Sequence, residues 1–341
     1  MNRRIVVAAV ASFLLGAPVV AEPQGVYKPE FKMSLVVSED TAWGRAAVRF
    51  ASGLRHRTRG RIQVKNYFGG TLFADRQTTE FRLLQQGDAD FAIGSTVNWS
   101  PQVKELNLFA MPFLFSGYGE LDAVQAGDPG IRLFKLLEQK SVVPLAWGEN
   151  GFRELTNAKR PVRRPEDLQG LNVRVVGVPI FIEMFRMLGA NPVSMNWGEA
   201  LIALQSGRLD GQENPLGLII PYRIWAYHRH VTLWRYAIDP LILAINAKTW
   251  SSLTPEDQSV VRAVAAEVMG LQKKEAREGL HHDMALPTAL EQQYGMVVVR
   301  LSPEERQAFR QRVRPVYEKW ASEIGVEMVR RAERIVEDSR R

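Results

Sequence analysis

The chain is predicted to fold as a layered α/β protein, because short apolar segments alternate with amphipathic helices from Phe31 onward. Its 341 residues favour two domains. The absence of cysteine excludes disulfides, thiol nucleophiles and thiolate metal sites. Stability must therefore come from an ordinary apolar core, which a chain of this length can bury.

The first 21 residues have the pattern of a signal peptide. Met1 to Arg4 carry two positive charges, and Ile5 to Gly16 form an apolar run. Pro18 interrupts this run before it reaches the roughly 20 residues of a spanning helix, and Val19-Val20-Ala21 offers the small residues that a signal peptidase recognises. We expect cleavage after Ala21 and release into the periplasm, because no later stretch is apolar for long enough to span a bilayer and no cysteine can carry a lipid.

The mature chain is expected to be mildly basic. Loss of Arg3 and Arg4 with the signal peptide, which has no acidic residue, lowers the net charge from +7 to +5. Acidic and basic residues alternate along most of the chain, so no nucleic-acid partner is expected. The arginine-rich segment 330–341 is predicted to be an exposed helix end.

The first part of the chain predicts three strands and two helices. Strands are expected at 31–37, 62–67 and 91–94. The first helix follows a polar capping turn, 38–41, and ends at Gly60; its expected buried face comprises Trp43, Ala46, Ala47, Phe50 and Leu54. A second helix, 75–86, stops at Gly87. Segment 95–100 is then predicted to be a polar loop at the carboxyl end of a strand, where open α/β sheets bind ligands.

The second part predicts another α/β unit and a helical end. Expected strands are 142–147, 172–175, 191–194 and 238–245, and expected helices are 180–188 and 197–205. The second of these helices begins with a capping box of Asn196 and Glu199. The C-terminal third is helical, since Thr254-Pro255 and Ser302-Pro303 each place an N-cap before a proline.

Motifs for catalysis or metal binding are sparse. The sequence contains no Gly-x-Ser-x-Gly elbow, P-loop or Gly-x-Gly-x-x-Gly turn after a strand. His228-x-His230 can place two imidazoles on one strand face, but the spacing gives no third ligand. We therefore expect no enzyme activity, metal or cofactor, and surface or interface positions for the histidines.

Arg174 is an unusual residue, because it lies within the apolar strand predicted at 172–175. A buried strand excludes a charge unless a partner is fixed nearby, and a guanidinium grips a carboxylate in two parallel bonds. That carboxylate can belong to a ligand or to an acidic residue of the protein, and the sequence leaves both open. Arg153 follows a strand and a glycine turn and can project into a cleft, while Trp197 can stack on a ligand or belong to the core.

Segment 170–215 resembles the signature region of the TRAP-transporter solute-binding proteins of the DctP family. It reads GLNVRVVGVPIFIEMFRMLGANPVSMNWGEALIALQSGRLDGQENP. Its ending, Asp210 to Pro215, is especially specific. Residues 147–157 (WGENGFRELTN) and 60–77 are also similar to the family, and the resemblance extends over essentially the whole mature chain.

This resemblance implies a two-lobed periplasmic binding protein of type II-like α/β fold, with strands crossing between the lobes and a long lobe-spanning helix. We assign 27–151 and 238–280 to lobe I, and 152–237 and 281–341, with the C-terminal helices, to lobe II. The resemblance also implies site residues. Arg174 would pair with the ligand carboxylate, Asn214 and Arg153 would donate to the same end, and Trp197 would lie beside the ligand; first-lobe candidates are Glu39, Ser95, Asn98 and Trp99, with Tyr236 from the later crossing segment.

The function implied is capture of a small organic carboxylate by cleft closure and delivery to a TRAP permease of small and large membrane subunits. Ser95 stands near the place of a carboxylate in the family's sialic-acid binders, so a sialate is not expected. Ser95 and Asn98 suit hydroxyl groups, so a hydroxy acid or sugar acid fits at least as well as a C4-dicarboxylate. The alternatives are a ligand-sensing receptor for a signalling partner, an exported enzyme and the binding protein of an ATP-driven transporter. A monomer is expected.

Overall fold

The computed structural model of the chain describes residues 27–74, 76–280 and 284–341. The predicted signal peptide with its cleavage site after Ala21, and the histidines His281 and His282, lie outside these residues. Within the described ranges, no helix is both long enough and apolar enough to cross a membrane.

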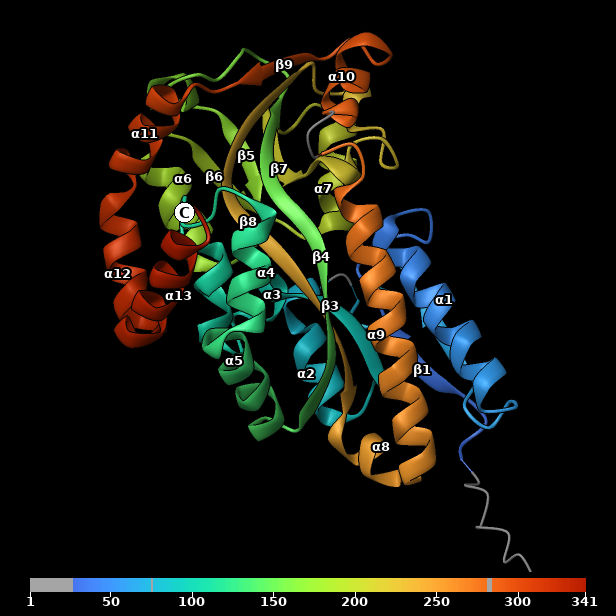
Figure 1. The fold of residues 1–341 in the computed structure, drawn as a ribbon. Coiled ribbons are helices and arrows are strands. Elements are labelled where there is room, and N and C mark those ends of the chain that lie inside the picture. Colours follow the sequence, from blue (N-terminus) through green and yellow to red (C-terminus); the bar gives the residue numbers. More distant parts are fainter. Residues whose placement is uncertain (1–26, 75, 281–283) are drawn as a thin grey trace, which may run out of the picture.

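One mixed sheet runs through the molecule, in the strand order β2-β1-β3-β8-β4-β7-β5-β6, with β9 beside β8 (Figure 1). Parallel strands form each end of the sheet, and the antiparallel pair β4 and β8 lies between them. The strand bounds are β1 Phe31–Ser34, β2 Val64–Tyr67, β3 Phe91–Ser95, β4 Val142–Asn157, β5 Asn172–Val175, β6 Asn191–Ser194, β7 Gly211–Pro215, β8 His230–Asn246 and β9 Val297–Arg300.

The long strands β4 and β8 belong to both halves of this sheet. They pair with each other from Val142↔Asn246 to Asn157↔His230. β3 joins β8 at residues 241–245, whereas β7 joins β4 at residues 153–157. The paired residues Gly151 and Asp239 therefore lie where the two strands cross from one half to the other.

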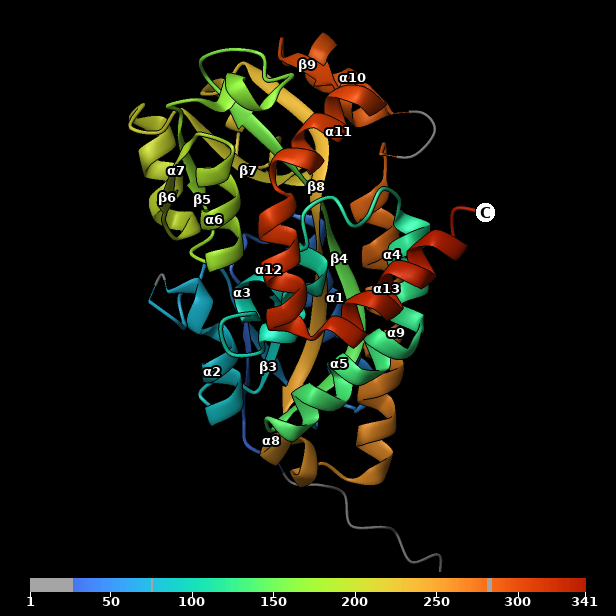
Figure 2. The same cartoon turned by 90° about the vertical axis from the view of Figure 1, so that its left-hand side faces the viewer.

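Helices cover both faces of the sheet (Figures 1 and 2). The long helix α9 packs against α1 and β4, and the C-terminal helices α12 and α13 pack against η2, α4, α5 and α6. The helix bounds are α1 Ala42–Arg57, α2 Glu80–Gln86, α3 Thr96–Trp99, α4 Tyr118–Ala126, α5 Asp128–Gln139, α6 Pro179–Met187, α7 Trp197–Gln205, α8 Ala247–Ser252, α9 Pro255–Arg277, α10 Ala285–Gln292, α11 Pro303–Arg312, α12 Arg314–Ile324 and α13 Val326–Asp338; the 3-10 turns are η1 Gln77–Thr79, η2 Lys104–Ala110, η3 Pro165–Leu168, η4 Leu216–Leu218 and η5 Ile224–Ala226.

Two apolar cores follow from this layering, one on each face of the sheet. Alternate residues of β8 divide between them: Ile242 and Ala244 pack in one core, and Leu241 and Leu243 pack in the other. The predicted inner face of α1 is buried in the second core. Its N-cap is Thr41, which accepts a hydrogen bond from the Gly44 N–H at 2.9 Å.

Local patterns predicted some elements correctly and missed others. The bounds predicted for β5, β6 and α7 match the structure. The prediction of a loop at 95–100 is wrong, because Ser95 accepts the N–H groups of Val97 and Asn98 and thereby caps the short helix α3. β7 and β9 were not predicted.

The strands predicted at 142–147 and 238–245 are only parts of longer strands. β4 continues through a register shift between Glu149 and Gly151, and Gly151 has a backbone φ of +121° that favours glycine. The glycine turn expected before Arg153 is therefore a bulge inside a continuous strand. The helix predicted from residue 75 has its described beginning in the 3-10 turn η1.

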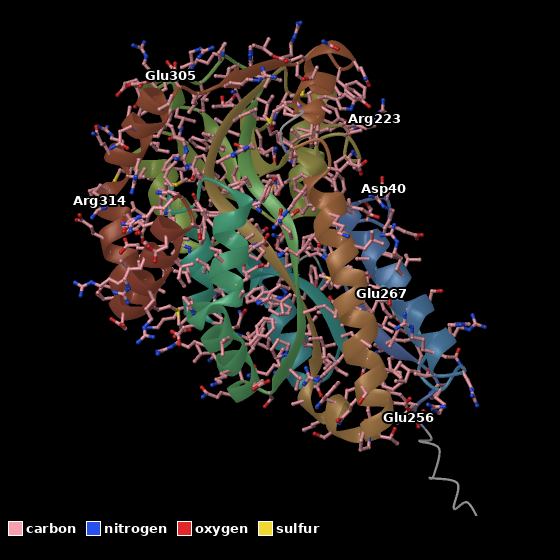
Figure 3. The ribbon with its side chains drawn as sticks, viewed as in Figure 1. Asp40, Arg223, Glu256, Glu267, Glu305 and Arg314 are labelled. Carbon is pink, nitrogen blue, oxygen red and sulfur yellow. The ribbon has the colours of Figure 1, made fainter. Side chains whose placement is uncertain are left out.

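Charged side chains of both signs lie on the outside of the molecule, as Glu267, Arg223 and Arg314 illustrate (Figure 3). The arginine-rich segment predicted as an exposed helix end forms the last part of α13 and the residues after it. Arg330, Arg334 and Arg340 are exposed there.

Candidate functional site

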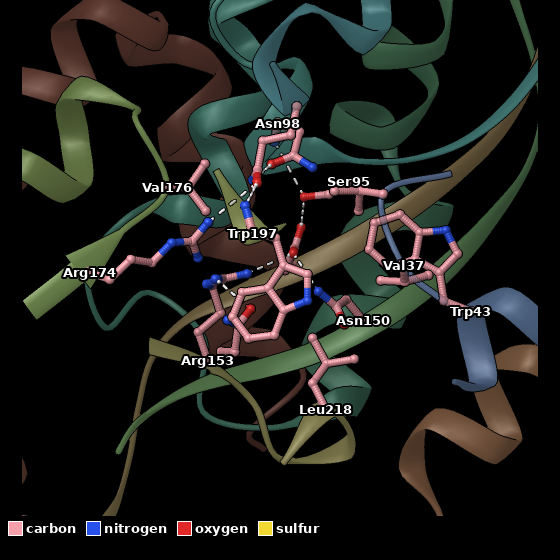
Figure 4. Close-up of a pocket in the computed structure, with 14 residues that line it drawn as sticks. Val37, Trp43, Ser95, Asn98, Asn150, Arg153, Arg174, Val176, Trp197 and Leu218 are labelled. Atoms are coloured by element: carbon pink, nitrogen blue, oxygen red, sulfur yellow. Dashed lines mark hydrogen bonds and ion pairs between the residues drawn. The ribbon is translucent and has the colours of Figure 1, made fainter. Parts of the chain in front are cut away.

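A narrow polar cavity lies at the crossing of β4 and β8 (Figure 4). It encloses about 30 Å³, whereas one water needs about 10–15 Å³. Its walls come from both ends of the sheet. The lining residues are Val36, Val37, Trp43, Gln77, Ser95, Asn98, Asn150, Arg153, Arg174, Val176, Trp197, Asn214, Leu218 and Asp239.

Arg174 enters this cavity from β5, with 1 % of its surface exposed. Its Nε donates to the Met195 carbonyl at 2.9 Å, and its Nη2 donates to Gln77 Oε1 at 3.3 Å. The guanidinium carbon lies 5.4 Å from the centre of the Trp197 ring. Among the described residues no carboxylate lies within ion-pair distance of Arg174, so the structure does not show the protein salt bridge that the sequence had left open.

Burial without an ion-pair partner affects the charge of Arg174. Desolvation lowers its pKa to about 10, despite the more distant attraction of Glu213. The side chain is therefore still a cation at neutral pH. Arg174 is a buried positive charge whose two hydrogen-bond acceptors are both neutral. A carboxylate that enters the cavity would give its guanidinium an ion-pair partner.

Arg153, in contrast, is already neutralised by the protein. Its Nε contacts Glu213 Oε2, its Nη1 lies 2.9 Å from Asp239 Oδ2, and its Nη2 donates to Asn214 Oδ1 at 3.0 Å. Burial acts to lower the pKa of Arg153, but the negative charges, led by Glu213, raise it above its ordinary value. Arg153 therefore belongs to a buried ion cluster that forms one wall of the cavity.

The cavity lining also contains the carboxylate of Asp239. Its Oδ1 accepts from Ser95 Oγ at 2.6 Å, and its Oδ2 accepts from Asn150 Nδ2 at 2.9 Å as well as from Arg153. Burial raises the pKa of Asp239. The Ser95 hydroxyl is thus committed to Asp239, and it also accepts the N–H groups that begin α3.

Gln77 joins the two halves of the cavity, although the sequence did not identify it. Its Nε2 donates to Asn98 Oδ1 at 2.9 Å on one side. On the other side its Oε1 accepts from the Trp197 backbone N–H at 2.7 Å and from Arg174. One carboxamide therefore connects η1, α3, β5 and the start of α7.

Most of the predicted site residues meet in this cavity. Arg174, Asn214, Arg153, Trp197, Ser95 and Asn98 line it. Gln77, Asn150 and Asp239 line it too and were missed. Asp239 could have been predicted in the same way as Arg174, because it is also a charged residue inside a predicted apolar strand. Gln77 has no sequence feature that marks it as a site residue.

Glu39 and Tyr236 lie outside the cavity lining. Glu39 is an exposed residue of the turn before α1. Tyr236 is fully buried behind the wall, where its hydroxyl donates to Glu213 Oε2 at 2.6 Å. Tyr236 thus supports the ion cluster rather than the cavity itself.

Trp99 also lies behind the wall, because α3 turns its side chain into the core. Its ring packs edge-on against Phe81, and its Nε1 donates to Glu80 Oε2 at 3.1 Å. The ring also occupies the space above Gly94, where an added Cβ would come within 2.0 Å of it. Trp99 is therefore a core residue.

Of the predicted histidine pair, His228 is buried rather than at the surface, and His230 is half-buried. The His228 Nδ1 lies 2.9 Å from the Thr156 hydroxyl, and burial lowers the pKa of His228 to about 4. In the described ranges, no group of three or more His, Cys, Asp or Glu side chains could hold a metal ion.

The family described as "Bacterial extracellular solute-binding protein, family 7", DctP, matches residues 33–323. The chain belongs to this family. Family 7 proteins are transport proteins that bind small carboxylates outside the cytoplasmic membrane and work with TRAP permeases.

Individual family members agree with this assignment. A TRAP periplasmic solute-binding protein of Ralstonia eutropha H16, solved with (S)-2-hydroxy-2-methyl-3-oxobutanoate, is 45% identical, covers 92% of this chain and 100% of its own, and has a TM-score of 0.90. One from Shewanella oneidensis, solved with succinate, is 28% identical with a TM-score of 0.83, covering 90% of this chain and 99% of its own. The C4-dicarboxylate-binding periplasmic protein DctP of Rhodobacter capsulatus is 28% identical over 96% of this chain and 97% of its own. The predicted two-lobed α/β fold class is confirmed.

Proposed function

We propose that this solute-binding protein captures a small monocarboxylate bearing hydroxyl or oxo groups, with Arg174 as the carboxylate anchor. The observation that supports this most directly is the buried guanidinium of Arg174, which has no carboxylate partner among the described residues. A ligand carboxylate beside it would gain charge-assisted hydrogen bonds in a buried site, where water screens them weakly. Trp197, whose ring already lies beside the guanidinium, would cover the ligand.

The part of the lining around Asp239 favours a neutral distal end on the ligand. Asp239 places a negative charge there, and Arg153 is already paired with two carboxylates. A second ligand carboxylate would meet Asp239 without a free cation to balance it. Asn98 and Asn150 have carboxamide groups in the wall that can bind hydroxyl or oxo oxygens. The Ralstonia relative, whose bound acid has one carboxylate, one hydroxyl and one oxo group, supports this choice.

Binding is proposed to act by closure of two lobes over the ligand, without a bond being broken. We place the lobes at 27–151 with 238–280 and at 152–237 with 281–341. A ligand touching both lobes stabilises the closed form by its greater affinity for that form. We further propose that the chain is exported by cleavage after Ala21, acts as a monomer and delivers its ligand to the membrane subunits of a TRAP permease.

A thermal-shift screen of the purified mature protein tests the ligand class. Hydroxy and oxo monocarboxylates, including 2-hydroxy-2-methyl-3-oxobutanoate, should raise the melting temperature, since a ligand at 100 times its dissociation constant adds about 2.7 kcal/mol of stability. Succinate and malate should produce much smaller shifts. Equal shifts with succinate would refute the monocarboxylate assignment, and shifts with neutral sugars alone would refute Arg174 as the anchor.

Exchanging Gln77 for glutamate should weaken ligand binding while the fold is retained. The new carboxylate would pair with Arg174 in place of the ligand, so affinity should fall at least about tenfold, or about 1.4 kcal/mol. Titration calorimetry of Q77E with the best ligand from the screen measures the effect.

Gln77→Ala is the matched control, because it removes the links to Asn98 and Trp197 without blocking Arg174. Its affinity should fall less than that of Q77E. Equal losses in both variants would show that Gln77 acts only as a link between the halves of the site.

A further inference from the structure

A chain of buried polar groups leads from the cavity to His228. Asn214 Nδ2 donates to Gln212 Oε1 at 2.7 Å, and Gln212 Nε2 donates to the Thr156 hydroxyl at 2.8 Å. Thr156 Oγ1 in turn lies 2.9 Å from His228 Nδ1. All four side chains are buried, and only Asn214 lines the cavity.

The donors and acceptors of this chain determine one another. Because the Thr156 hydroxyl accepts from Gln212, its single proton is available for the His228 Nδ1 lone pair. Gln212 must then present its oxygen to Asn214, which donates one of its two amide protons to that oxygen. The Asn214 oxygen faces Arg153, from which it accepts a hydrogen bond at 3.0 Å.

We propose that His228 is a positioning residue for the ligand site. Through Thr156 and Gln212, it holds the Asn214 carboxamide so that the remaining amide proton is directed into the cavity and donates to the bound carboxylate. This inference rests on the proposed carboxylate site. His228 does not touch the ligand and acts only through the hydrogen bonds of this chain.

The opposite direction of these hydrogen bonds is unfavourable at the end that meets the cavity. If Thr156 donated to Gln212, the Gln212 amide would turn its nitrogen toward Asn214, and Asn214 would turn its own nitrogen toward Arg153. Two donors would then face each other. Because Arg153 fixes the cavity end, the Thr156 hydroxyl donates to His228 Nδ1, which can accept because burial keeps the imidazole neutral at pH 7 by lowering its pKa to about 4.

Packing alone does not explain why a histidine occupies the buried position 228. Its Nε2 is buried and has no hydrogen-bond partner in the described part of the chain. Burying an unpaired polar atom is unfavourable, and an apolar ring would avoid that penalty. The acceptor at Nδ1 is what an apolar ring could not supply.

Thr156→Val tests the proposal, because it removes the hydroxyl while keeping the shape of the side chain. Calorimetric affinity for the best carboxylate should fall about tenfold in T156V, and Thr156→Ser should stay within about twofold of the wild type. His228→Phe should match T156V. Because H228F removes a buried side chain that could be needed for folding, T156V remains the decisive variant.

The Asn214→Ala background separates positioning from general structural damage. If the chain acts through Asn214, adding T156V to N214A should change affinity by less than about twofold. The same tenfold loss in both backgrounds would overturn the proposal. The proposal would also be overturned if T156V bound the carboxylate as tightly as the wild type while an Arg174 variant did not bind it. If the wild type bound no carboxylate at all, that result would refute the proposed function instead.

Discussion

Arg174→Met is expected to abolish carboxylate binding and to leave the ligand-free protein at least as stable as the wild type. Binding should weaken by at least about 30-fold, or about 2 kcal/mol, because the ligand would be buried without its charged partner. Stability should not suffer, since burial lowers the pKa of Arg174 to about 10 and therefore disfavours the charged form in the folded state. Calorimetry and denaturant unfolding measure the two effects.

Arg174→Lys distinguishes charge from geometry at this position. A lysine ammonium is a point charge that cannot form two parallel hydrogen bonds with a carboxylate, so binding should weaken in this variant as well. Affinity equal to the wild type in R174K would show that charge alone matters. Unchanged affinity in R174M would show that Arg174 does not bind the ligand carboxylate.

Arg153→Met should have the opposite effect on stability, although the two arginines line the same cavity. Its removal leaves the carboxylates of Glu213 and Asp239 buried without their shared cation. Breaking such a buried pair costs about 3–5 kcal/mol. Denaturant unfolding of the ligand-free R153M protein, beside R174M as its matched control, measures the difference.

The pH dependence of R153M supplies an independent check. Burial already raises the pKa of Asp239, and loss of the cation should raise it further above its value in the unfolded chain. Groups with raised folded pKa values stabilise most when protonated, so the stability deficit of R153M should shrink between about pH 8 and about pH 5. A deficit that is the same at both pH values, or that is absent, would show that Arg153 contributes by packing rather than by charge.

The elements that the sequence predicted well are those specified by local signals. β5, β6 and α7 are short, are bounded by glycine or capping residues, and have the predicted limits. The strand predicted at 142–147 stops before the end of β4 because Asn150 and Arg153 interrupt the apolar pattern near the crossing. The strand predicted at 238–245 includes Asp239 but misses the first part of β8, residues 230–237. Asn150 and Arg153 line the cavity, so for β4 the local rule failed where the candidate site begins.

The site residues that could be predicted are those that stand out in the local sequence or in the family resemblance. Arg174 was conspicuous as a charge in an apolar strand, and the family resemblance added Asn214. Gln77 was not predictable in this way, because its importance lies in contacts with Asn98 and Trp197 that only the folded chain brings together. Trp99 follows a predicted strand, but the sequence does not show that a helical turn directs its side chain into the core.

The paired strands β4 and β8 have a mechanical consequence for the proposed closure. Sliding one strand along the other would break their ladder of hydrogen bonds, whereas twisting the two-stranded ribbon along its length preserves it. We therefore expect the lobes to open by torsion of this ribbon, with the register shifts at Glu149/Gly151 and Arg153/Leu155 as its most compliant points. Since Arg153 lies at one of these points, the ion cluster that forms a wall of the cavity would also set the torsional stiffness of the hinge.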